Sequence, residues 1–198
     1  MINVMLTGVG GQGTVLAAKV LAQAAQEKGW HVRTAETIGM AQRGGSVVSH
    51  VRMGDAGEEV YSPLIAKDSA DVVIAFEPAE AARVLPYLSQ TGVLVSASTA
   101  VQPVTAALAK DPYRGSSVIA GLEKAFAQAP DQLVIVPDDE LLERVGNRKA
   151  LNTVLLASAI RTERLPLSLN DLRDALRVCV KPAFVELNLN AVEAALTI

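Results

Sequence analysis

The chain has 198 residues, of which 50% are hydrophobic, 20% are charged and 4% are aromatic, and its formal net charge is −3. This length favours one domain, over residues 1–198, and the hydrophobic content excludes an intrinsically disordered chain. The small negative charge gives no basic surface that would attract nucleic acid. No apolar run reaches the ~18 residues of a membrane span, so neither nucleic acid nor a membrane is an expected partner.

Cysteine and histidine are too scarce for metal chemistry housed within this chain. Cys179 is the only cysteine, and His31 and His50 are the only histidines. One thiolate cannot hold an iron–sulfur cluster or a structural zinc ion by itself, so no metal site is expected. The start of the chain lacks the basic region of a secretory signal, which predicts a cytoplasmic protein.

The first two thirds of the chain alternate between strand-like and helix-like segments. Short apolar or β-branched runs predict strands at Ile2–Leu6, His31–Ala35, Ser46–Met53, Asp71–Phe76, Gly92–Ser96 and Gln132–Val136. Runs rich in alanine and leucine predict helices at Thr14–Ala25 and Pro78–Leu85. The least regular stretch, Ala97–Ser117, is expected to be a loop or an excursion.

The last third of the chain is expected to be helical. Helices are predicted at Asp138–Val145, Lys149–Arg161, Ser168–Val178 and Pro182–Leu196. Ser168 and Asp171 are spaced as a capping pair before an apolar stripe. The predicted fold class is therefore α/β: a Rossmann-like three-layer sandwich with a mainly parallel sheet and a helical C-terminal part.

The first candidate site is a glycine-rich turn between the first strand and the first helix. Its sequence, Gly8-Val9-Gly10-Gly11-Gln12-Gly13, fits the pattern G-x-G-x-x-G in the context that nucleotide binding requires. Glycines let backbone N–H groups approach a phosphate, and the helix N-terminus adds partial positive charge. Glu36, 23 residues after Gly13, stands where an acid would hold a ribose hydroxyl. The candidate cofactor-binding residues are Gly8, Gly10, Gly11, Gln12, Gly13 and Glu36; a tight turn without a ligand is the alternative.

The second candidate site follows the second predicted strand, from Glu36 to Ser46. It combines an acid, an amide, a guanidinium and several glycines within eleven residues. Arg43 could clamp a carboxylate or a phosphate through two hydrogen bonds, and adjacent glycines allow close approach of another backbone. A solvated surface loop is the alternative, although methionine and alanine suit such a loop poorly. The candidate residues for partner or ligand contact are Met40, Gln42, Arg43, Gly44 and Gly45.

No other group of residues indicates catalysis, and no catalytic residue is assigned. Strand alternation places Ser49 and His50 on opposite faces. The acidic run 138–140 is interpreted as a helix cap with favourable N-terminal charge, and Cys179 as a buried, inert thiol. Buried capping or interface hydrogen bonds are expected for Asn152, Asn188 and Asn190.

Three stretches together carry a family resemblance. They are the glycine-rich turn 8–13, the run Glu36-Thr37-Ile38-Gly39-Met40-Ala41-Gln42-Arg43-Gly44-Gly45, and the run Lys149-Ala150-Leu151-Asn152-Thr153-Val154-Leu155-Leu156. With them the chain resembles the gamma subunits or domains of 2-oxoacid:ferredoxin (acceptor) oxidoreductases over almost its whole length. Within that family the resemblance is to the beta subunits of indolepyruvate ferredoxin oxidoreductase.

The resemblance implies a subunit of an enzyme that oxidatively decarboxylates indolepyruvate or another aryl pyruvate to an acyl-CoA. Thiamine diphosphate and 4Fe–4S clusters would belong to a large partner subunit, and ferredoxin would be reached through the complex. The isolated chain would be inactive. Coenzyme A or another nucleotide at the glycine-rich turn is left open, as is a homodimer of the isolated chain. The alternatives are a stand-alone NAD(P)-binding oxidoreductase and a non-catalytic assembly module.

Overall fold

The computed structural model describes residues 1–39, 45–55, 57–101 and 113–197. Its strands are β1 (Ile2–Val9), β2 (His31–Ile38), β3 (Ser46–Gly54), β4 (Ala70–Ala75), β5 (Leu88–Ala97) and β6 (Leu133–Val136). Its helices are α1 (Thr14–Glu27), α2 (Pro78–Val84), α4 (Gly115–Ala125), α5 (Asp138–Val145), α6 (Leu151–Arg161), α7 (Leu169–Cys179) and α8 (Val185–Ala195). Short 3-10 turns lie at η1 (Leu85–Tyr87), η2 (Pro130–Gln132), η3 (Arg148–Ala150) and η4 (Pro182–Phe184).

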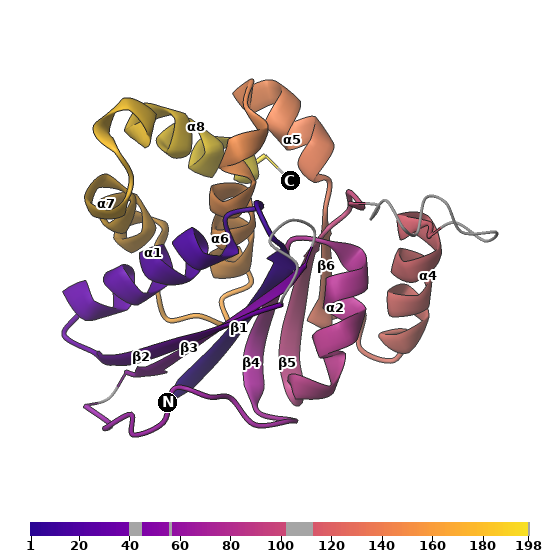
Figure 1. Cartoon of the computed structure of the whole chain (residues 1–198), viewed down its shortest axis with the longest axis horizontal. Helices are drawn as coiled ribbons and strands as arrows, with labels where there is room; N and C mark the ends of the chain where they lie inside the picture. The colour runs from indigo at the N-terminus through magenta and orange to yellow at the C-terminus, as the bar shows by residue number, and fades with distance from the viewer. Residues whose placement is uncertain (40–44, 56, 102–112, 198) are drawn as a thin grey trace.

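The strands form one six-stranded sheet in the order β2-β3-β1-β4-β5-β6 (Figure 1). The pairs β1–β4, β4–β5 and β5–β6 are parallel, whereas β3 is antiparallel to both β1 and β2. The predicted α/β class with a mainly parallel sheet is therefore confirmed. After β1 the chain forms β2 and β3 on one side of β1, and it then crosses to form β4 on the other side. Ligands of open α/β sheets gather at the carboxyl ends of strands where the order reverses in this way.

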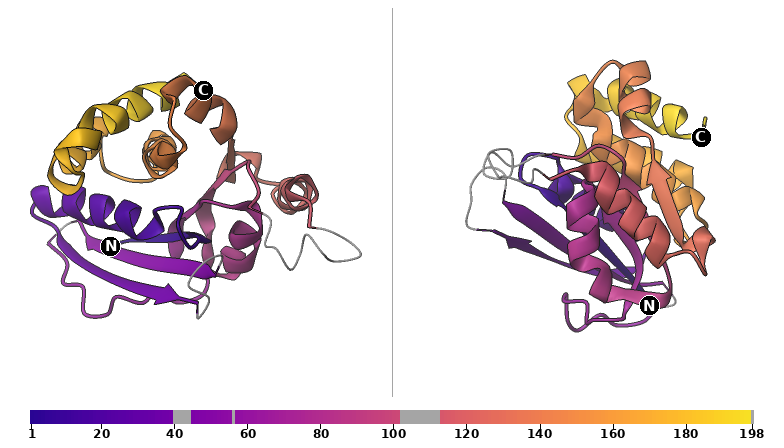
Figure 2. Two further views of the ribbon diagram at one scale, coloured as in Figure 1. Left: turned by 45° about the horizontal axis from the view of Figure 1, so that its top comes forward. Right: turned by 90° about the vertical axis from the view of Figure 1, so that its right-hand side faces the viewer.

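Helices cover both faces of the sheet (Figures 1 and 2). On one face, α1, α6, α7 and α8 share a large hydrophobic cluster with the even-numbered residues of β1. On the other face, residues of α2 and α4 pack with Met5, Val73 and Leu94. Helix α6 is buried on every side, because each residue from Leu151 to Ile160 is enclosed. This burial explains why α6 reads as almost uniformly apolar rather than amphipathic.

The sequence did not predict α4. Its first residues fall in the stretch that is expected to be irregular, and two serines together with Gly115 and Gly121 lower the helix propensity of this segment. The apolar side chains of Leu122 and Phe126 nevertheless recur at helical spacing and are buried against the sheet. Tertiary packing therefore stabilises a helix that local propensity disfavours.

Other boundaries differ by a few residues. Strand β5 begins at Leu88 rather than Gly92, and its first residues pair irregularly with β4. The predicted cap of α7 is confirmed, because the Ser168 hydroxyl accepts from the Asp171 N–H and the Asp171 carboxylate accepts from the Ser168 N–H.

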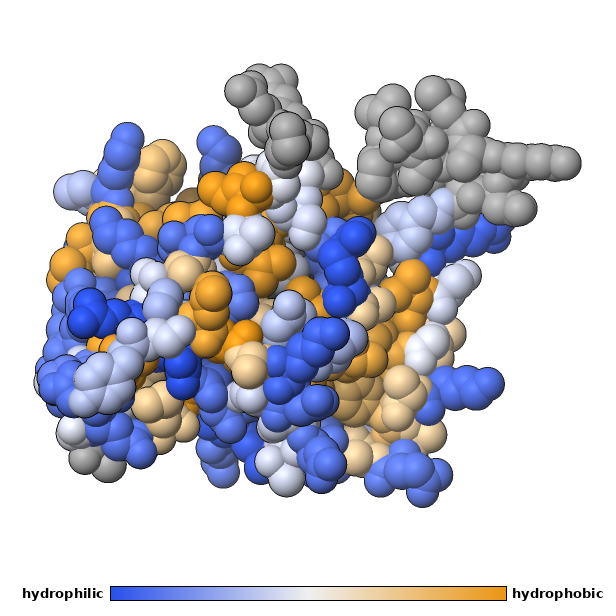
Figure 3. Space-filling view, turned by 60° about the horizontal axis from the view of Figure 1, so that its bottom comes forward, coloured by the Kyte–Doolittle hydropathy of each residue, from blue (hydrophilic) through white to orange (hydrophobic). Residues whose placement is uncertain are grey.

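Exposed hydrophobic side chains are spread over several elements, as on the face shown in Figure 3. Among the described helices, none is both long enough and apolar enough to span a bilayer.

Candidate functional site

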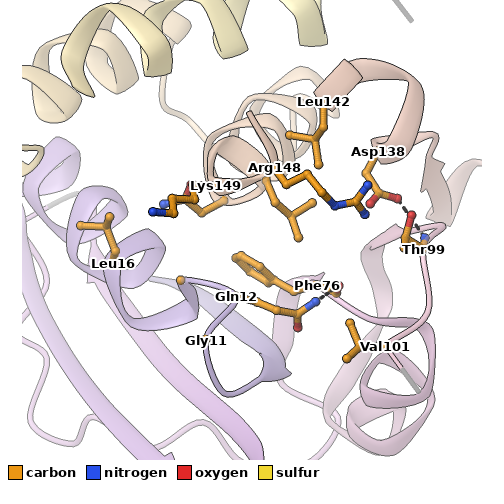
Figure 4. Close-up of a pocket in the computed structure, with 13 residues that line it drawn as sticks. Gly11, Gln12, Leu16, Phe76, Thr99, Val101, Asp138, Leu142, Arg148 and Lys149 are labelled. Carbon is orange, nitrogen blue, oxygen red and sulfur yellow. Dashed lines mark hydrogen bonds between the residues drawn. The ribbon is translucent and has the colours of Figure 1, made fainter. Parts of the chain in front are cut away.

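A cavity of about 450 Å³ lies where β1, β4 and β5 reach their carboxyl ends (Figure 4). The glycine turn forms one wall, and the segment from η3 into α6 forms the opposite wall. The ends of β4 and β5 and the start of α5 complete the lining. The lining residues are Gly11, Gln12, Gly13, Leu16, Phe76, Thr99, Val101, Asp138, Leu142, Arg148, Lys149, Leu151 and Asn152. The cavity therefore occupies the position that the reversal of strand order predicts.

The glycine turn has the backbone geometry that its sequence predicts. Gly11 and Gly13 have φ angles of +103° and +86°, in the left-handed region that disfavours other residues. A Cβ at Gly8 would lie 2.8 Å from the Cβ of Phe76, so this position has no room for a side chain. These glycines allow the chain to leave β1 and enter α1 without a longer loop.

Gln12 fixes the turn to the end of β4. Its side-chain oxygen accepts a hydrogen bond from the Val9 N–H at 2.7 Å, and its side-chain amide donates to the Phe76 carbonyl at 2.8 Å. Both ends of the carboxamide are therefore bonded to the protein. Gln12 is a structural clamp in this conformation, and the turn that it holds faces the cavity.

The electrostatics of the cavity favour an anion. Helix α1 begins at Thr14 after the N-cap Gly13, and no side chain caps it. The first N–H groups of a helix have no partner within the helix and carry partial positive charge, and Gly13 and Leu16 bring this end of α1 into the lining of the cavity. Lys149 adds a cation from the opposite wall, whereas the charge of Arg148 is paired with Asp139. A phosphate or carboxylate is the chemical group that this combination binds.

Two aspartates at the start of α5 shape the rim. Asp138 is buried, and its Oδ1 accepts from the N–H groups of Ser98 and Thr99 and from the Ser98 hydroxyl. It therefore anchors the chain after β5. The expected side-chain cap of α5 was wrong, because Pro137 is the N-cap and makes no such bond. The Arg148 guanidinium, 2.7 Å from Asp139 Oδ1, holds the pKa of that carboxyl below its usual value.

Asn152 is a buried polar residue of the lining. Only 3% of its surface is exposed, and its Oδ1 is buried without a hydrogen-bond partner among the described residues. Its side chain lies against Gly13, 3.6 Å from where a Cβ of that glycine would stand. The sequence predicted a buried hydrogen bond for this asparagine, and the described structure provides none. That expectation holds for Asn188, which accepts from the Thr153 hydroxyl and donates to the Phe184 carbonyl, whereas Asn190 is exposed.

A buried acidic pair lies next to the glycine turn, at the start of α2. Glu77 accepts a hydrogen bond from the Tyr113 hydroxyl, and Glu80 accepts one from the Ser46 hydroxyl, both at 2.5 Å. Burial and the bond to Glu77 raise the pKa of Tyr113 above its usual value. The Gly10 N–H donates to the Gly45 carbonyl at 2.9 Å, so residues 45–46 are tied to both the turn and α2.

The structure brings together most of the first predicted site and part of the second. Residues 8–13 form one turn, and Gly45 contacts it. Met40, Gln42, Arg43 and Gly44 lie outside the described residues. Glu36 is exposed on β2 and does not line the cavity. Because β3 lies between β2 and β1, Glu36 is two strands from the turn. In a dinucleotide-binding fold the acid follows a parallel strand next to β1, whereas here the antiparallel β3 occupies that position.

Two further expectations can be compared with the structure. Ser49 and His50 are on opposite faces of β3, and the Nδ1 of His50 accepts from the Ile65 N–H at 3.2 Å. Cys179 is only partly buried, at the end of α7, and burial raises the pKa of its thiol. The apolar neighbours of Cys179 predict that it is fully buried, and this prediction is wrong. The adjacent Val178 is itself 63% exposed on the surface of α7.

The sequence reasoning missed the opposite wall of the cavity. Arg148, Lys149 and Asn152 were not proposed as site residues, although Lys149 and Asn152 belong to the third stretch that carried the family resemblance. Their distance from the turn along the chain hides their proximity in space. Among the residues that the structure describes, no group of three His, Cys, Asp or Glu side chains could hold a metal ion.

Comparison with known proteins gives a consistent family match. Residues 3–198 match the family model described as pyruvate ferredoxin/flavodoxin oxidoreductase. The chain is 37% identical to the indolepyruvate oxidoreductase subunit IorB of Archaeoglobus fulgidus, over 97% of this chain and 92% of that protein. It is 34% identical to the subunit of the same name from Pyrococcus horikoshii, over 96% of this chain and 91% of that protein.

A solved structure shows the same fold. The gamma subunit of a keto/oxoacid ferredoxin oxidoreductase from Geobacter sulfurreducens superimposes with a TM-score of 0.69 at 23% identity. The superposition covers 100% of both chains. The Rossmann-like arrangement predicted from the sequence therefore has a known counterpart of equal extent.

Proposed function

The chain belongs to the pyruvate ferredoxin/flavodoxin oxidoreductase family, and from that membership we propose that it is the smaller subunit of a 2-oxoacid:ferredoxin oxidoreductase. Its substrate would be indolepyruvate or another aryl pyruvate, which the complex decarboxylates oxidatively to an acyl-CoA. The observation that carries this proposal is the nearly end-to-end match with indolepyruvate oxidoreductase subunits.

In this proposal the redox chemistry belongs to a large partner subunit. Thiamine diphosphate would supply carbanion chemistry there, and 4Fe–4S clusters would pass electrons to ferredoxin. The residues of this chain do not fit such groups: it has a single cysteine, and its described part holds no cluster of three potential metal ligands. No step of the redox reaction is assigned to this chain.

The contribution of this chain would be to bind and orient an anionic ligand. The free N–H groups at the start of α1, together with Lys149, suit the phosphate of coenzyme A or of another nucleotide. Gln12 would keep the turn in its binding conformation. Contact of Met40, Gln42, Arg43, Gly44 and Gly45 with the partner or its ligand stays a proposal from the sequence.

Reconstitution tests the proposal. We expect the purified chain to be colourless and inactive with an aryl pyruvate, coenzyme A and a redox dye, and activity to appear when the large subunit is added. Turnover by the chain alone, with or without NAD(P)H, would contradict the proposal and favour a stand-alone oxidoreductase.

The anion site is tested in the same reconstituted complex. Removing the charge with Lys149→Ala should raise the KM for coenzyme A by about tenfold, since ~1.4 kcal/mol corresponds to a factor of ten and a charged hydrogen bond exceeds that. The matched control is Lys67→Ala, because Lys67 is exposed near the amino end of β4, away from the cavity. An unchanged KM in Lys149→Ala would favour an assembly module.

A further inference from the structure

The lining of the cavity contains two cationic residues, and a carboxylate of the protein itself holds one of them. Arg148 and Lys149 lie next to each other in the chain, where η3 leads into α6. The Arg148 guanidinium lies 2.7 Å from Oδ1 of Asp139, in the first turn of α5. In Figure 4 this guanidinium points toward Asp138 and Thr99, whereas Lys149 extends in another direction. The charge of Arg148 is therefore directed to the rim of the cavity.

Asp139 occupies Arg148 in the way that an anionic ligand would. The hydrogen bond from Arg148 is the main cause that holds the pKa of the Asp139 carboxyl below its usual value, so this carboxyl is ionised at neutral pH. The pair connects the first turn of α5 to η3, two segments that both contribute to the lining. An anion in the cavity and the carboxylate of Asp139 therefore compete for the same guanidinium.

The pair is exposed, which makes it easy to break. Of the two side chains, that of Arg148 is 68% exposed and that of Asp139 is 55% exposed. Exposed ion pairs contribute little to stability, because water screens the charges and the ordering of two side chains costs entropy. A phosphate group carries more negative charge than a carboxylate, and a partly enclosed cavity contains less water to screen its attraction. The exchange of Asp139 for such a ligand therefore favours the ligand.

We propose that Asp139 is an internal competitor of the anionic ligand: it holds Arg148 at the rim of the ligand-free cavity, and a bound phosphate displaces it and takes over the guanidinium. This inference rests on the proposed function, because it requires an anion in the cavity, and it adds the residue that limits how tightly the anion binds. Removal of Asp139 should strengthen binding, whereas removal of a residue that orients Arg148 toward the ligand would weaken it.

The test is calorimetric titration of the full-length chain with pyrophosphate. Asp139→Asn should bind pyrophosphate about threefold to fivefold more tightly than the wild type, since that range corresponds to the contribution of an exposed ion pair. Glu140→Gln is the matched control, because it removes an exposed carboxylate from the same turn of α5. It should change the affinity by less than about twofold, because salt at about 0.15 M screens charges that are not in contact.

A double-mutant cycle separates the release of Arg148 from a general change in charge. When Arg148→Gln is already present, Asp139→Asn should change the affinity by less than about twofold, because no guanidinium remains to be released. Lys149→Ala should weaken the binding of pyrophosphate with and without Asp139→Asn, as expected for an anion held in the cavity. Asp139, Glu140 and Arg148 are all exposed, so these substitutions leave the hydrophobic core unchanged.

This inference and the proposed function fail in different ways. Unchanged or weaker binding by Asp139→Asn, an equal gain in Glu140→Gln, or a gain that persists without Arg148 would each overturn the role of Asp139. No measurable binding of pyrophosphate, or binding that is insensitive to Lys149→Ala, would overturn it as well. Absence of activity after reconstitution would instead remove the proposed function, whatever the titrations show.

Discussion

Gln12 and Asn152 are two carboxamides beside one glycine turn that differ in their hydrogen bonds. Gln12 closes the turn through bonds to Val9 and Phe76, so its contribution is to the conformation of the protein. Asn152 is as well enclosed as a core residue and yet bonds to nothing described. An unsatisfied buried polar group lowers stability by about 1–3 kcal/mol.

His50 gives the folded chain a pH-dependent stability. It is 7% exposed on β3, its Nδ1 accepts from the Ile65 N–H, and burial lowers its pKa below the usual 6.5. The unfolded chain therefore binds more protons than the folded chain as the pH falls below about 6.5. The stabilisation by neutral His50 should be complete above that pH and should be lost as the pH falls toward the folded-state pKa.

Urea unfolding at pH 7.5 and at pH 5.5 measures this effect. The free energy of unfolding should fall between the two pH values in the wild type and fall less in His50→Gln. His31→Asn is the matched control, because it replaces the exposed histidine and leaves the buried imidazole in place. The same decrease in His50→Gln as in the wild type would show that carboxylates alone cause the pH dependence.

At the scale of elements, helix α7 and helix α4 illustrate two ways in which a helix is stabilised. Helix α7 begins with a reciprocal cap between Ser168 and Asp171. Burial alone would raise the pKa of Asp171, but the Ser168 hydrogen bonds and Lys28 lower it overall. Helix α4 has no side-chain cap, and its position depends on Leu122 and Phe126 packing against the sheet. The cap of α7 can be predicted from residues that are close in sequence, whereas the packing of α4 against the sheet cannot.

Removing the cap of α7 should destabilise the protein measurably. Ser168→Ala deletes the hydroxyl that accepts from the Asp171 N–H, and loss of such a cap costs about 0.5–2 kcal/mol. The matched control is Ser117→Ala, since Ser117 is exposed within α4 and surface changes usually stay within about 0.5 kcal/mol. Chemical denaturation of both variants gives the comparison. Equal effects of the two substitutions would contradict a specific role of the cap.

At the scale of the whole molecule, α6 connects the sheet to the C-terminal helices. All of its residues from Leu151 to Ile160 are buried, and its first turn forms a wall of the cavity. The hydrophobic cluster on this face joins residues of β1, α1 and α6 to residues of α7 and α8. The position of Asn152 beside Gly13 therefore depends on the packing of the C-terminal helices as a group.

Truncation of a core side chain in α6 should destabilise the whole chain. Leu155 is fully buried, and Leu155→Ala should lower the free energy of unfolding by about 2–5 kcal/mol through lost burial and the cavity that remains. Leu196→Ala is the matched control, because Leu196 is 39% exposed after the end of α8. We expect it to cost less than about 1 kcal/mol. A small effect of Leu155→Ala, measured by chemical denaturation, would contradict the central role of α6.

The sequence by itself determined the features that depend on neighbouring residues. Short-range sequence patterns predict the alternation of strands and helices, the glycine turn and the cap of α7. The three stretches that carried the family resemblance are equally local. These predictions succeeded because backbone conformation at glycine and hydrogen bonds at a helix start are set within a few residues.

Only the tertiary structure decided which distant segments meet. It inserted β3 between β1 and β2, which moved Glu36 away from the turn, and it placed Asn152 against Gly13 and Lys149 in the lining of the same cavity. It also formed α4 from a segment of low helix propensity. Strand order and the packing of α6 depend on burying apolar surface between segments far apart in sequence, and no local pattern specifies that pairing.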